Sequence, residues 1–153
     1  MHYYSITFAC YNSVEYTKQC VSSLVEAETP MDRVVVVDNG SHDGTRDYLA
    51  DQSFGKVILN KANLGCGVAW NQGALEQQSD WTIVMNNDVL VTPQWAERLI
   101  DAAIQLNVKV ISPAMIEGPL DYDFQKFATN AEKRLATIYR QGARHAVCLA
   151  VHK

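Results

Sequence analysis

An unbroken run of four β-branched residues, Val34 to Val37, constrains the fold of this chain more than any other feature. A strand with one face in water alternates apolar and polar residues, whereas this run is apolar at every position. It therefore predicts a strand over residues 33–38 that is covered on both faces, as in the centre of a parallel sheet. The run ends on Asp38, so we expect a carboxylate at the carboxyl end of a buried strand.

Segments typical of strands alternate with segments typical of helices along the rest of the chain. Strands are predicted over residues 4–9, 33–38, 56–60, 81–85, 109–112 and 146–151. Helices are predicted from Ser13 up to Pro30, and over 43–51, 68–78 and 93–106. This alternation predicts an α/β fold with a mostly parallel central sheet and helices on both faces.

Apolar spacing and capping residues define three of these helices. On one side the first helix is expected to carry Val14, Cys20, Val21, Leu24 and Val25. Asp43 is expected to cap the second helix. Thr92 is expected to cap the helix that follows the fourth strand, with Pro93 as its first residue.

A chain of 153 residues has the size of one domain, and we expect a single domain over 1–153. Residues 1–112 carry the clear patterns and form its core, whereas residues 113–153 have only weak helical periodicity over 121–137 before the last strand. No apolar run reaches the roughly 20 residues of a membrane span, and a signal peptide is not evident. The four cysteines are scattered, which favours reduced thiols. These features predict a cytoplasmic protein.

Charge is distributed unevenly along the chain. Residues 1–125 hold 7 Lys and Arg against 16 Asp and Glu, whereas residues 126–153 hold 6 Lys and Arg against Glu132 alone. The acidic bulk argues against nucleic-acid binding. The basic segment suits peripheral contact with the inner face of a membrane, or a phosphorylated acceptor, or simply a solvated helix face.

A polar triplet, Asn86-Asn87-Asp88, follows the predicted strand 81–85. In open α/β sheets, ligands bind at the carboxyl ends of the strands, where this triplet would lie. One carboxylate with amide oxygens suits Mg²⁺ or Mn²⁺ that also holds substrate phosphates, because such ions keep positions for phosphate and water. Taken alone, the triplet is equally consistent with an ordinary loop.

Other strand ends carry side chains that suit a nucleotide. Asp38 can accept hydrogen bonds from a base or from ribose, and Tyr11 can stack on a base or simply cap the core. The turn Gly65-Cys66-Gly67 either offers helical N–H groups to an anion or allows close packing of helix on sheet. A G-x-G-x-x-G fingerprint and a Walker A loop are absent, so a metal at Asp88 would have to neutralise the phosphates.

Together these motifs resemble family 2 glycosyltransferases, which have the nucleotide-diphospho-sugar transferase (GT-A) fold, a Rossmann-like sandwich. The matching elements, in order over residues 4–110, are Tyr11-Asn12, Val37-Asp38-Asn39-Gly40-Ser41-x-Asp43-Gly44-Thr45, Asn63-Leu64-Gly65 with Ala69-x-Asn71-x-Gly73, and Asn86-Asn87-Asp88 followed by Pro93. The sequence is most similar to the rhamnosyltransferase-type branch, whose metal motif often reads Asn-x-Asp.

The resemblance implies a role for each matching residue. Asp88 would be the metal ligand beside the diphosphate, and Asn86 stands where the family's first Asp meets ribose or metal. The residues expected to bind the nucleotide are Ala9, Tyr11, Asp38, Asn63, Gly65, Asn71, Asn86 and Asn87. Because Asn86 replaces a carboxylate, we expect weaker metal binding than at a site with two carboxylates.

The activity implied by the resemblance is transfer, with inversion, of a sugar from a UDP- or dTDP-sugar to a glycan or lipid-linked acceptor. Inversion needs a general base, which family members take from an acidic motif, often Glu-Asp, beyond the strand that resembles 146–151. Residues 113–153 hold no such pair, and the catalytic base stays unassigned. The residues left as candidates are Asp121, Asp123, Glu132 and His145, the last being more typical of a structural or surface histidine. We therefore expect the donor-binding part of a C-terminally truncated enzyme.

Two other functions are weighed against this one. The first is a non-catalytic or incomplete nucleotide-sugar-binding module that lacks the catalytic base. The second is a sugar nucleotidyltransferase, which would need a glycine-rich loop with Arg or Lys after the first strand, and residues 10–14 offer none. A sheet that stops midway exposes an edge strand, so we also expect a homo-oligomer formed through residues 113–153.

Overall fold

The structure is a computed structural model and describes residues 2–115, 123–124, 126–127, 130 and 147–153. Its strands are β1 (Tyr4–Cys10), β2 (Val34–Asp38), β3 (Lys56–Leu59), β4 (Trp81–Asn86), β5 (Val110–Ile111) and β6 (Cys148–His152). Its helices are α1 (Val14–Glu26), α2 (Thr45–Ala50), α3 (Cys66–Glu76) and α4 (Trp95–Gln105), with a short 3₁₀ helix η1 (Met31–Arg33). The predicted alternation of strands and helices is confirmed.

These strands form one six-stranded sheet with the order β3-β2-β1-β4-β6-β5. The first four strands pair in parallel, and β6 runs antiparallel to both β4 and β5. The mostly parallel sheet is therefore as predicted. Insertion of β6 between β4 and β5 was not predicted, because it joins segments that lie far apart in the sequence.

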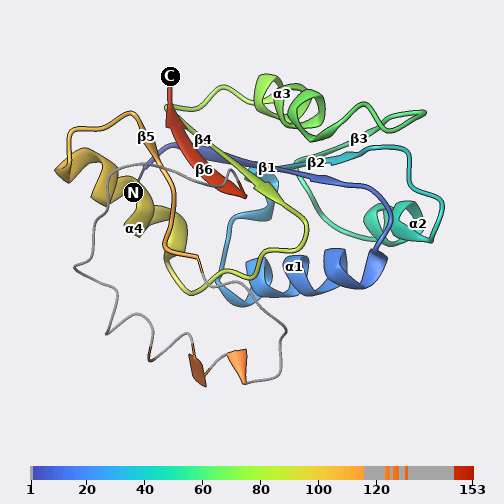
Figure 1. The fold of residues 1–153 in the computed structure, drawn as a ribbon, viewed down its shortest axis with the longest axis horizontal. Helices are drawn as coiled ribbons and strands as arrows, with labels where there is room; N and C mark the ends of the chain where they lie inside the picture. The colour runs from blue at the N-terminus through green and yellow to red at the C-terminus, as the bar shows by residue number, and fades with distance from the viewer. Residues whose placement is uncertain (1, 116–122, 125, 128–129, 131–146) are drawn as a thin grey trace.

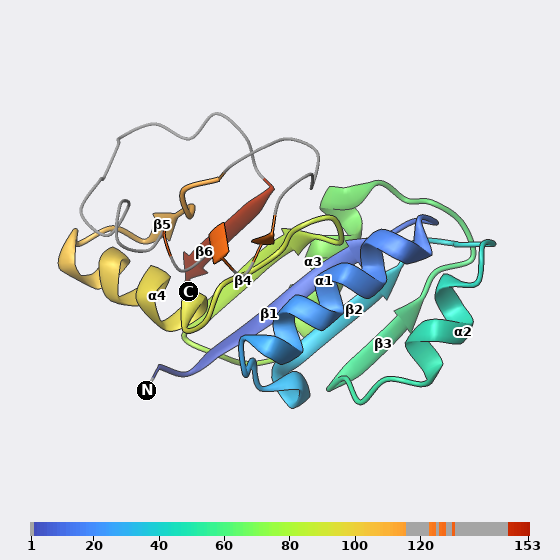
Figure 2. The ribbon, with the colours of Figure 1, turned by 90° about the horizontal axis from the view of Figure 1, so that it is seen from below.

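Helices cover both faces of the sheet, as Figures 1 and 2 show: α1, α2 and α4 lie on one face and α3 on the other. The main core lies between the sheet and the first group, where Phe8 and Ile83 meet Leu24 and Ile100 with no exposed surface. All four valines of Val34 to Val37 are also fully buried. The continuous β-branched run thus marks a strand covered on both faces.

Helix α3 rests directly on β1 through Gly73. A Cβ atom added to Gly73 would lie 1.8 Å from Oγ1 of Thr7, so only glycine fits at this contact. Gly65, by contrast, has open space around its Cα and a φ of +86°, a backbone conformation that favours glycine. Close packing therefore explains Gly73, and backbone conformation explains Gly65.

Several predicted details of the helices are wrong. Val25 is 57% exposed, because the buried stripe of α1 runs through Thr17, Cys20 and Leu24 and leaves Val25 beyond its edge. Helix α4 begins at Trp95 rather than at Pro93, and Gln94, not Thr92, holds the cap position. The Thr92 carbonyl instead accepts a hydrogen bond from the Trp95 N–H, which closes a turn before the helix.

Several predictions fall on residues that the structure does not describe. Of the candidate bases, Asp121, Glu132 and His145 lie outside the described residues. Most of the helical periodicity expected over 121–137 lies there, as does most of the segment 113–153 through which self-association is expected. Among the helices that are described, not one has both the length and the apolar character needed to cross a bilayer.

Candidate functional site

The carboxyl ends of β1, β2 and β4 meet at one edge of the sheet. The register pairs Cys10 with Asp38, and Ala9 with Asn86. From β1 the chain adds β2 and β3 on one side and β4 on the other, so the direction of winding reverses between β1 and β4. Ligands of open α/β sheets bind at such a switch point, which makes this edge the candidate site.

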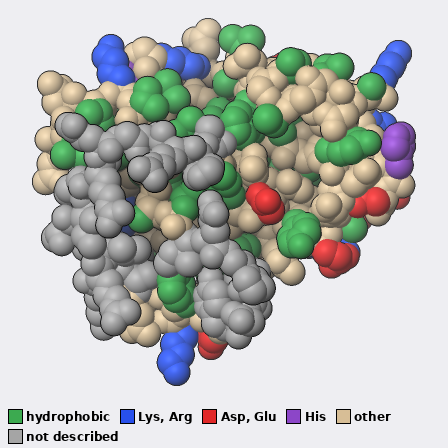
Figure 3. Space-filling view, in the orientation of Figure 1, with side chains coloured by type: hydrophobic (Ala, Val, Ile, Leu, Met, Phe, Trp, Pro, Cys, Tyr) green, Lys and Arg blue, Asp and Glu red, His purple; other side chains and the backbone are tan. Residues whose placement is uncertain are grey.

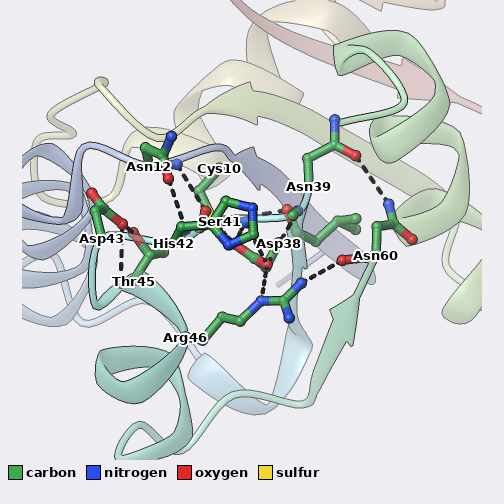
Figure 4. Close-up of polar contacts among 12 residues, drawn as sticks. Cys10, Asn12, Asp38, Asn39, Ser41, His42, Asp43, Thr45, Arg46 and Asn60 are labelled. Atoms are coloured by element: carbon green, nitrogen blue, oxygen red, sulfur yellow. Dashed lines mark hydrogen bonds and ion pairs between the residues drawn. The ribbon is translucent and has the colours of Figure 1, made fainter. Parts of the chain in front are cut away.

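At the end of β2, the Asp38 carboxylate is fully buried and held by the protein itself. It accepts hydrogen bonds from the N–H groups of Gly40 and Ser41, at 3.1–3.3 Å, and pairs with Nε of Arg46 at 2.7 Å (Figure 4). Arg46 also donates to the backbone carbonyl of Asn60 at the end of β3. Arg46 thus ties the ends of two strands together and compensates a buried charge.

A second network, built from amides, lies beside Asp38. The Asn39 side chain donates to Asn63 Oδ1 at 3.0 Å and to the Gly65 carbonyl at 3.2 Å, and accepts from Nδ2 of Asn60. Asn60 in turn exchanges two hydrogen bonds with Gln72 of α3. The predicted nucleotide contacts Asn63 and Gly65 are therefore tied to β2 through Asn39.

The Asp43 carboxylate accepts hydrogen bonds at the amino ends of two helices. Its Oδ2 accepts from the Val14 N–H at the start of α1, and its Oδ1 accepts from the N–H and hydroxyl of Thr45 at the start of α2. Gly44 rather than Asp43 occupies the cap position of α2, so the predicted position is off by one residue although Asp43 does bond the helix end. Slight desolvation raises the pKa of Asp43, but these hydrogen bonds outweigh it and bring the pKa below its usual 3.8.

At the end of β4, the Asp88 carboxylate is in the opposite state to Asp38. Asp88 is exposed, and within the described residues its side chain makes no hydrogen bond or ion pair. The Asn86 side chain is half-buried and likewise free of such partners there, while its backbone N–H donates to the Val147 carbonyl beside β6. Asn87 differs, because its Nδ2 donates to Oγ1 of Thr17 at 3.0 Å.

The donor set at this strand end fits a divalent cation that also binds phosphate oxygens. Across the described residues no group of three or more Asp, Glu, His or Cys side chains could bind a metal by itself. Asp88 offers one hard carboxylate and Asn86 one amide oxygen, which leaves positions for phosphate oxygens and water, as Mg²⁺ prefers. These two side chains would therefore suit a metal that takes its other ligands from phosphate and water.

The remaining predicted contacts are spread around the same edge. Ala9 lies on β1 next to both Val37 and Asn86, and Tyr11, 46% exposed, directly follows β1. Asn71 is exposed on α3. The register thus brings Ala9 and Asn86 together, and hydrogen bonds join Asn63 and Gly65 to β2, whereas no described contact joins Asn71 to them.

Three of the four cysteine thiols are buried. Burial, with a smaller contribution from the charge of Asp38, raises the pKa of Cys10 to about 12, and burial likewise raises the pKa values of Cys20 and Cys148 to about 12. Cys66, in the turn before α3, is exposed. Three of the four cysteines therefore serve as small core residues.

Two residues of the site were not predicted from the sequence. Arg46 neutralises Asp38, and Trp70 of α3 donates from Nε1 to the Met85 carbonyl at 3.0 Å, just before the polar triplet. A cation eight residues after Asp38 was the only available sign of Arg46.

A cavity of ≈ 400 Å³ lies at the opposite edge, lined by residues that include Tyr3, Asp80 and Lys153, far from the polar strand ends. The strand ends, not the size of a cavity, mark the site.

The fold and this edge define an open α/β domain of the class that binds ligands at a switch point. The family model described as glycosyl transferase family 2 matches residues 5–150, and the chain belongs to this family. Among its relatives, an uncharacterised glycosyltransferase of Rickettsia conorii is 28% identical over 107 residues, which are 69% of this chain and 18% of that protein. Glycosyltransferase AglE of Haloferax volcanii is 23% identical over 135 residues, 84% of this chain and 43% of that protein.

Solved structures share the fold. A mannosyltransferase of Pyrobaculum calidifontis, in complex with GDP-Man and Mn²⁺, matches 99% of this chain and 45% of its own, with a TM-score of 0.71 and 17% identity. S. aureus TarS 1–349 in complex with UDP-GlcNAc matches 75% of this chain and 37% of its own, with a TM-score of 0.61 and 18% identity. The fold is therefore the GT-A fold, and the chain spans less than half the length of each of these proteins.

Proposed function

We propose that this chain binds a nucleotide-diphospho-sugar through Mg²⁺ or Mn²⁺ and takes part in transfer of the sugar, with inversion, to a glycan or lipid-linked acceptor. The observation that carries the proposal is the exposed Asp88 carboxylate beside Asn86, which has no hydrogen bond or ion pair within the described residues and lies at the switch point between β1 and β4. Membership of glycosyl transferase family 2 supports the same activity.

The role proposed for each residue follows from its place on the edge. Asp88 and Asn86 would hold the metal, while Ala9 and Tyr11 line the base at the end of β1. The N–H groups at the start of α3, together with Asn63, Gly65 and Asn71, would enclose the nucleotide. Asp38 would reach a base only by exchanging one of its present donors. We infer that this donor is Arg46, whose side chain is 38% exposed, whereas Gly40 and Ser41 donate from the backbone.

The chemistry of transfer divides between the metal and the protein. A bound Mg²⁺ or Mn²⁺ supplies Lewis acidity to the leaving diphosphate. The chain's own residues orient the donor: the carboxylate of Asp88 and the amide of Asn86 fix the diphosphate end, and the ends of β1 and β2 fix the nucleoside end. Such positioning would lower the activation free energy of transfer, because translational and rotational entropy is lost on binding and not in the chemical step.

Calorimetric titration tests the donor site directly. The protein would be titrated with UDP, dTDP and GDP, each with and without Mn²⁺; the third is included because the mannosyltransferase neighbour holds GDP-Man. Binding that appears or strengthens with Mn²⁺ for one of the three would support the proposal and identify the base. Absence of metal-dependent binding for all three would overturn it.

A non-catalytic or incomplete nucleotide-sugar-binding module is the second candidate. It is favoured by one observation on the sequence: residues 113–153 hold no Glu-Asp pair, which leaves the general base unassigned. Sugar transfer by this chain, supplied with a donor and an acceptor, would exclude the module. Binding of the donor without turnover would favour it.

The acceptor and the place of action are proposed from the sequence alone. The basic segment 126–153 is the basis for proposing an acceptor on or near an anionic membrane surface, with the protein in the cytoplasm. Sedimentation with vesicles that contain anionic lipid, compared with neutral vesicles, would test the membrane contact.

A further inference from the structure

The segment that carries Asp88 is fastened to helix α1 on either side of that residue. Asn87 Nδ2 donates to Oγ1 of Thr17 at 3.0 Å, and the Val91 N–H donates to Oγ of Ser23 at 3.2 Å. Residues 87 and 91 are therefore both bonded to α1.

On the helix, the two acceptors lie six residues apart on the buried side. Thr17 has no exposed surface, and Ser23 is 5% exposed. Burying a hydroxyl without a partner costs free energy, and the Ser23 hydroxyl also donates to the Cys20 carbonyl within the helix. The Thr17 hydroxyl has its partner among the described residues in the segment after β4, at Asn87.

Asp88 lies between the two fastened residues, Asn87 and Val91, and is exposed. Its own side chain has no hydrogen bond or ion pair in the described parts of the chain, so nothing holds the carboxylate except the backbone on either side. On the β4 side that backbone is fixed from the other face of the sheet by Trp70, whose Nε1 donates to the Met85 carbonyl. The segment is thus held by α3 before the triplet and by α1 after it.

We infer that Thr17 and Asn87 are positioning residues for the Asp88 carboxylate, and that Asn87 serves this purpose in place of contacting the nucleotide. The inference rests on the proposed function, in which Asp88 holds the metal. Residues that orient a metal ligand without touching the metal typically affect its affinity about 10- to 100-fold when they are replaced. Because one neutral hydrogen bond is involved, we expect the lower end of that range for Thr17.

Three variants with matched shapes separate positioning from packing. Thr17→Val keeps the size of the side chain and removes the hydroxyl, whereas Thr17→Ser keeps the hydroxyl and removes a methyl group. Thr82→Val is the control, because Thr82 is also buried but its hydroxyl has no hydrogen-bond partner among the residues that the structure describes. The readout is the ratio of UDP, dTDP or GDP affinity with Mn²⁺ to affinity without it, by calorimetry.

We expect this ratio to fall about tenfold in Thr17→Val, to be restored in Thr17→Ser and to be unchanged in Thr82→Val. Asn87→Leu should give the same fall, and the double variant Thr17→Val/Asn87→Leu no further fall, since both remove one contact. A wild-type ratio in Thr17→Val, or an equal fall in Thr17→Ser, would overturn the inference.

A ligand-free measurement separates failure of the inference from failure of the proposed function. Amide hydrogen exchange of Val91, whose N–H donates to Oγ of Ser23, should be faster in Thr17→Val than in the wild type and in Thr82→Val, because opening of the segment becomes easier. Unchanged exchange would overturn the inference whatever the nucleotide data show. Wild-type protein without metal-dependent binding would instead overturn the proposed function.

Discussion

Asp38 and Asp88 end neighbouring parts of the same sheet edge, yet their carboxylates are in opposite states. The Asp38 carboxylate is fully buried and bonded to two backbone N–H groups and to Arg46. The Asp88 carboxylate is exposed and has no such partner within the described residues, although the backbone around it is fastened to α1 and α3. The Asp38 carboxylate is held by bonds to its own oxygen atoms, whereas Asp88 is positioned by the contacts of the residues on either side of it.

This difference separates two ways of building a binding edge. A buried carboxylate must be compensated, so removal of Asp38 would leave buried donors and the charge of Arg46 without their partner. An exposed carboxylate contributes little to stability and keeps its lone pairs for a ligand. Replacing the first should therefore damage the fold, and replacing the second should damage only binding.

The largest expected effect is on Asp38. In Asp38→Ala, the buried N–H groups of Gly40 and Ser41 and the charge of Arg46 lose their acceptor. We expect the free energy of unfolding to fall by about 3 kcal/mol, the low end for a broken buried pair, because the Arg46 side chain is 38% exposed and water can solvate it. Urea denaturation measures this. Asp51→Ala, at an exposed carboxylate, is the control. An equal loss of unfolding free energy in both variants would contradict the claim that the buried carboxylate matters more for stability than an exposed one.

The next effect concerns α3. This helix is bonded to Asn60, after β3, through Gln72 and to the Met85 carbonyl of β4 through Trp70. In Gly73→Ala the new Cβ would lie 1.8 Å from Thr7 Oγ1, so α3 must shift, at a cost of about 2 kcal/mol. The same change in a Thr7→Ala background should cost less than half as much, because the nearest remaining Thr7 atom is Cβ at 3.0 Å. Equal costs in both backgrounds, by thermal or urea unfolding, would show that the contact does not set the position of α3.

The smallest expected effect is the pH dependence contributed by Asp43. Its pKa is lower in the folded protein than its usual 3.8, so its contribution to stability is complete above that value and is lost as the pH falls through the lower, folded pKa. The stability advantage of the wild type over Asp43→Asn should accordingly be constant from pH 7 to 5 and shrink below pH about 4. An advantage that grows on acidification would contradict this sign.

Much of the fold could be predicted because its signals are local. The buried valine run fixed β2 as a covered strand, and the apolar runs ahead of Asp38 and Asn86 placed both residues at carboxyl ends of parallel strands. Parallel strands covered by helices bring those ends to one edge, so the position of the site followed from the pattern.

What could not be predicted depends on contacts between distant segments. Nothing near Asp38 in the sequence indicates that Arg46 compensates it, and nothing in α1 indicates that Thr17 accepts a hydrogen bond from Asn87, 70 residues away. The predicted cap of α4 was wrong for a related reason. The hydrogen bond from the Trp95 N–H to the Thr92 carbonyl closes a turn, so the helix begins at Trp95 and not at Pro93, the locally preferred first residue. Roles of the individual nucleotide contacts stay predictions.

Binding of Mn²⁺ and nucleotide to Asp88→Ala, measured by calorimetry beside wild type and Asp51→Ala, tests the central claim most directly. Loss of a charged ligand should lower the metal-dependent affinity by at least about 100-fold, while the free energy of unfolding changes by no more than about 0.5 kcal/mol. Asp51→Ala should match the wild type in both. Metal-dependent binding that survives in Asp88→Ala would contradict the assignment of Asp88 as the metal ligand.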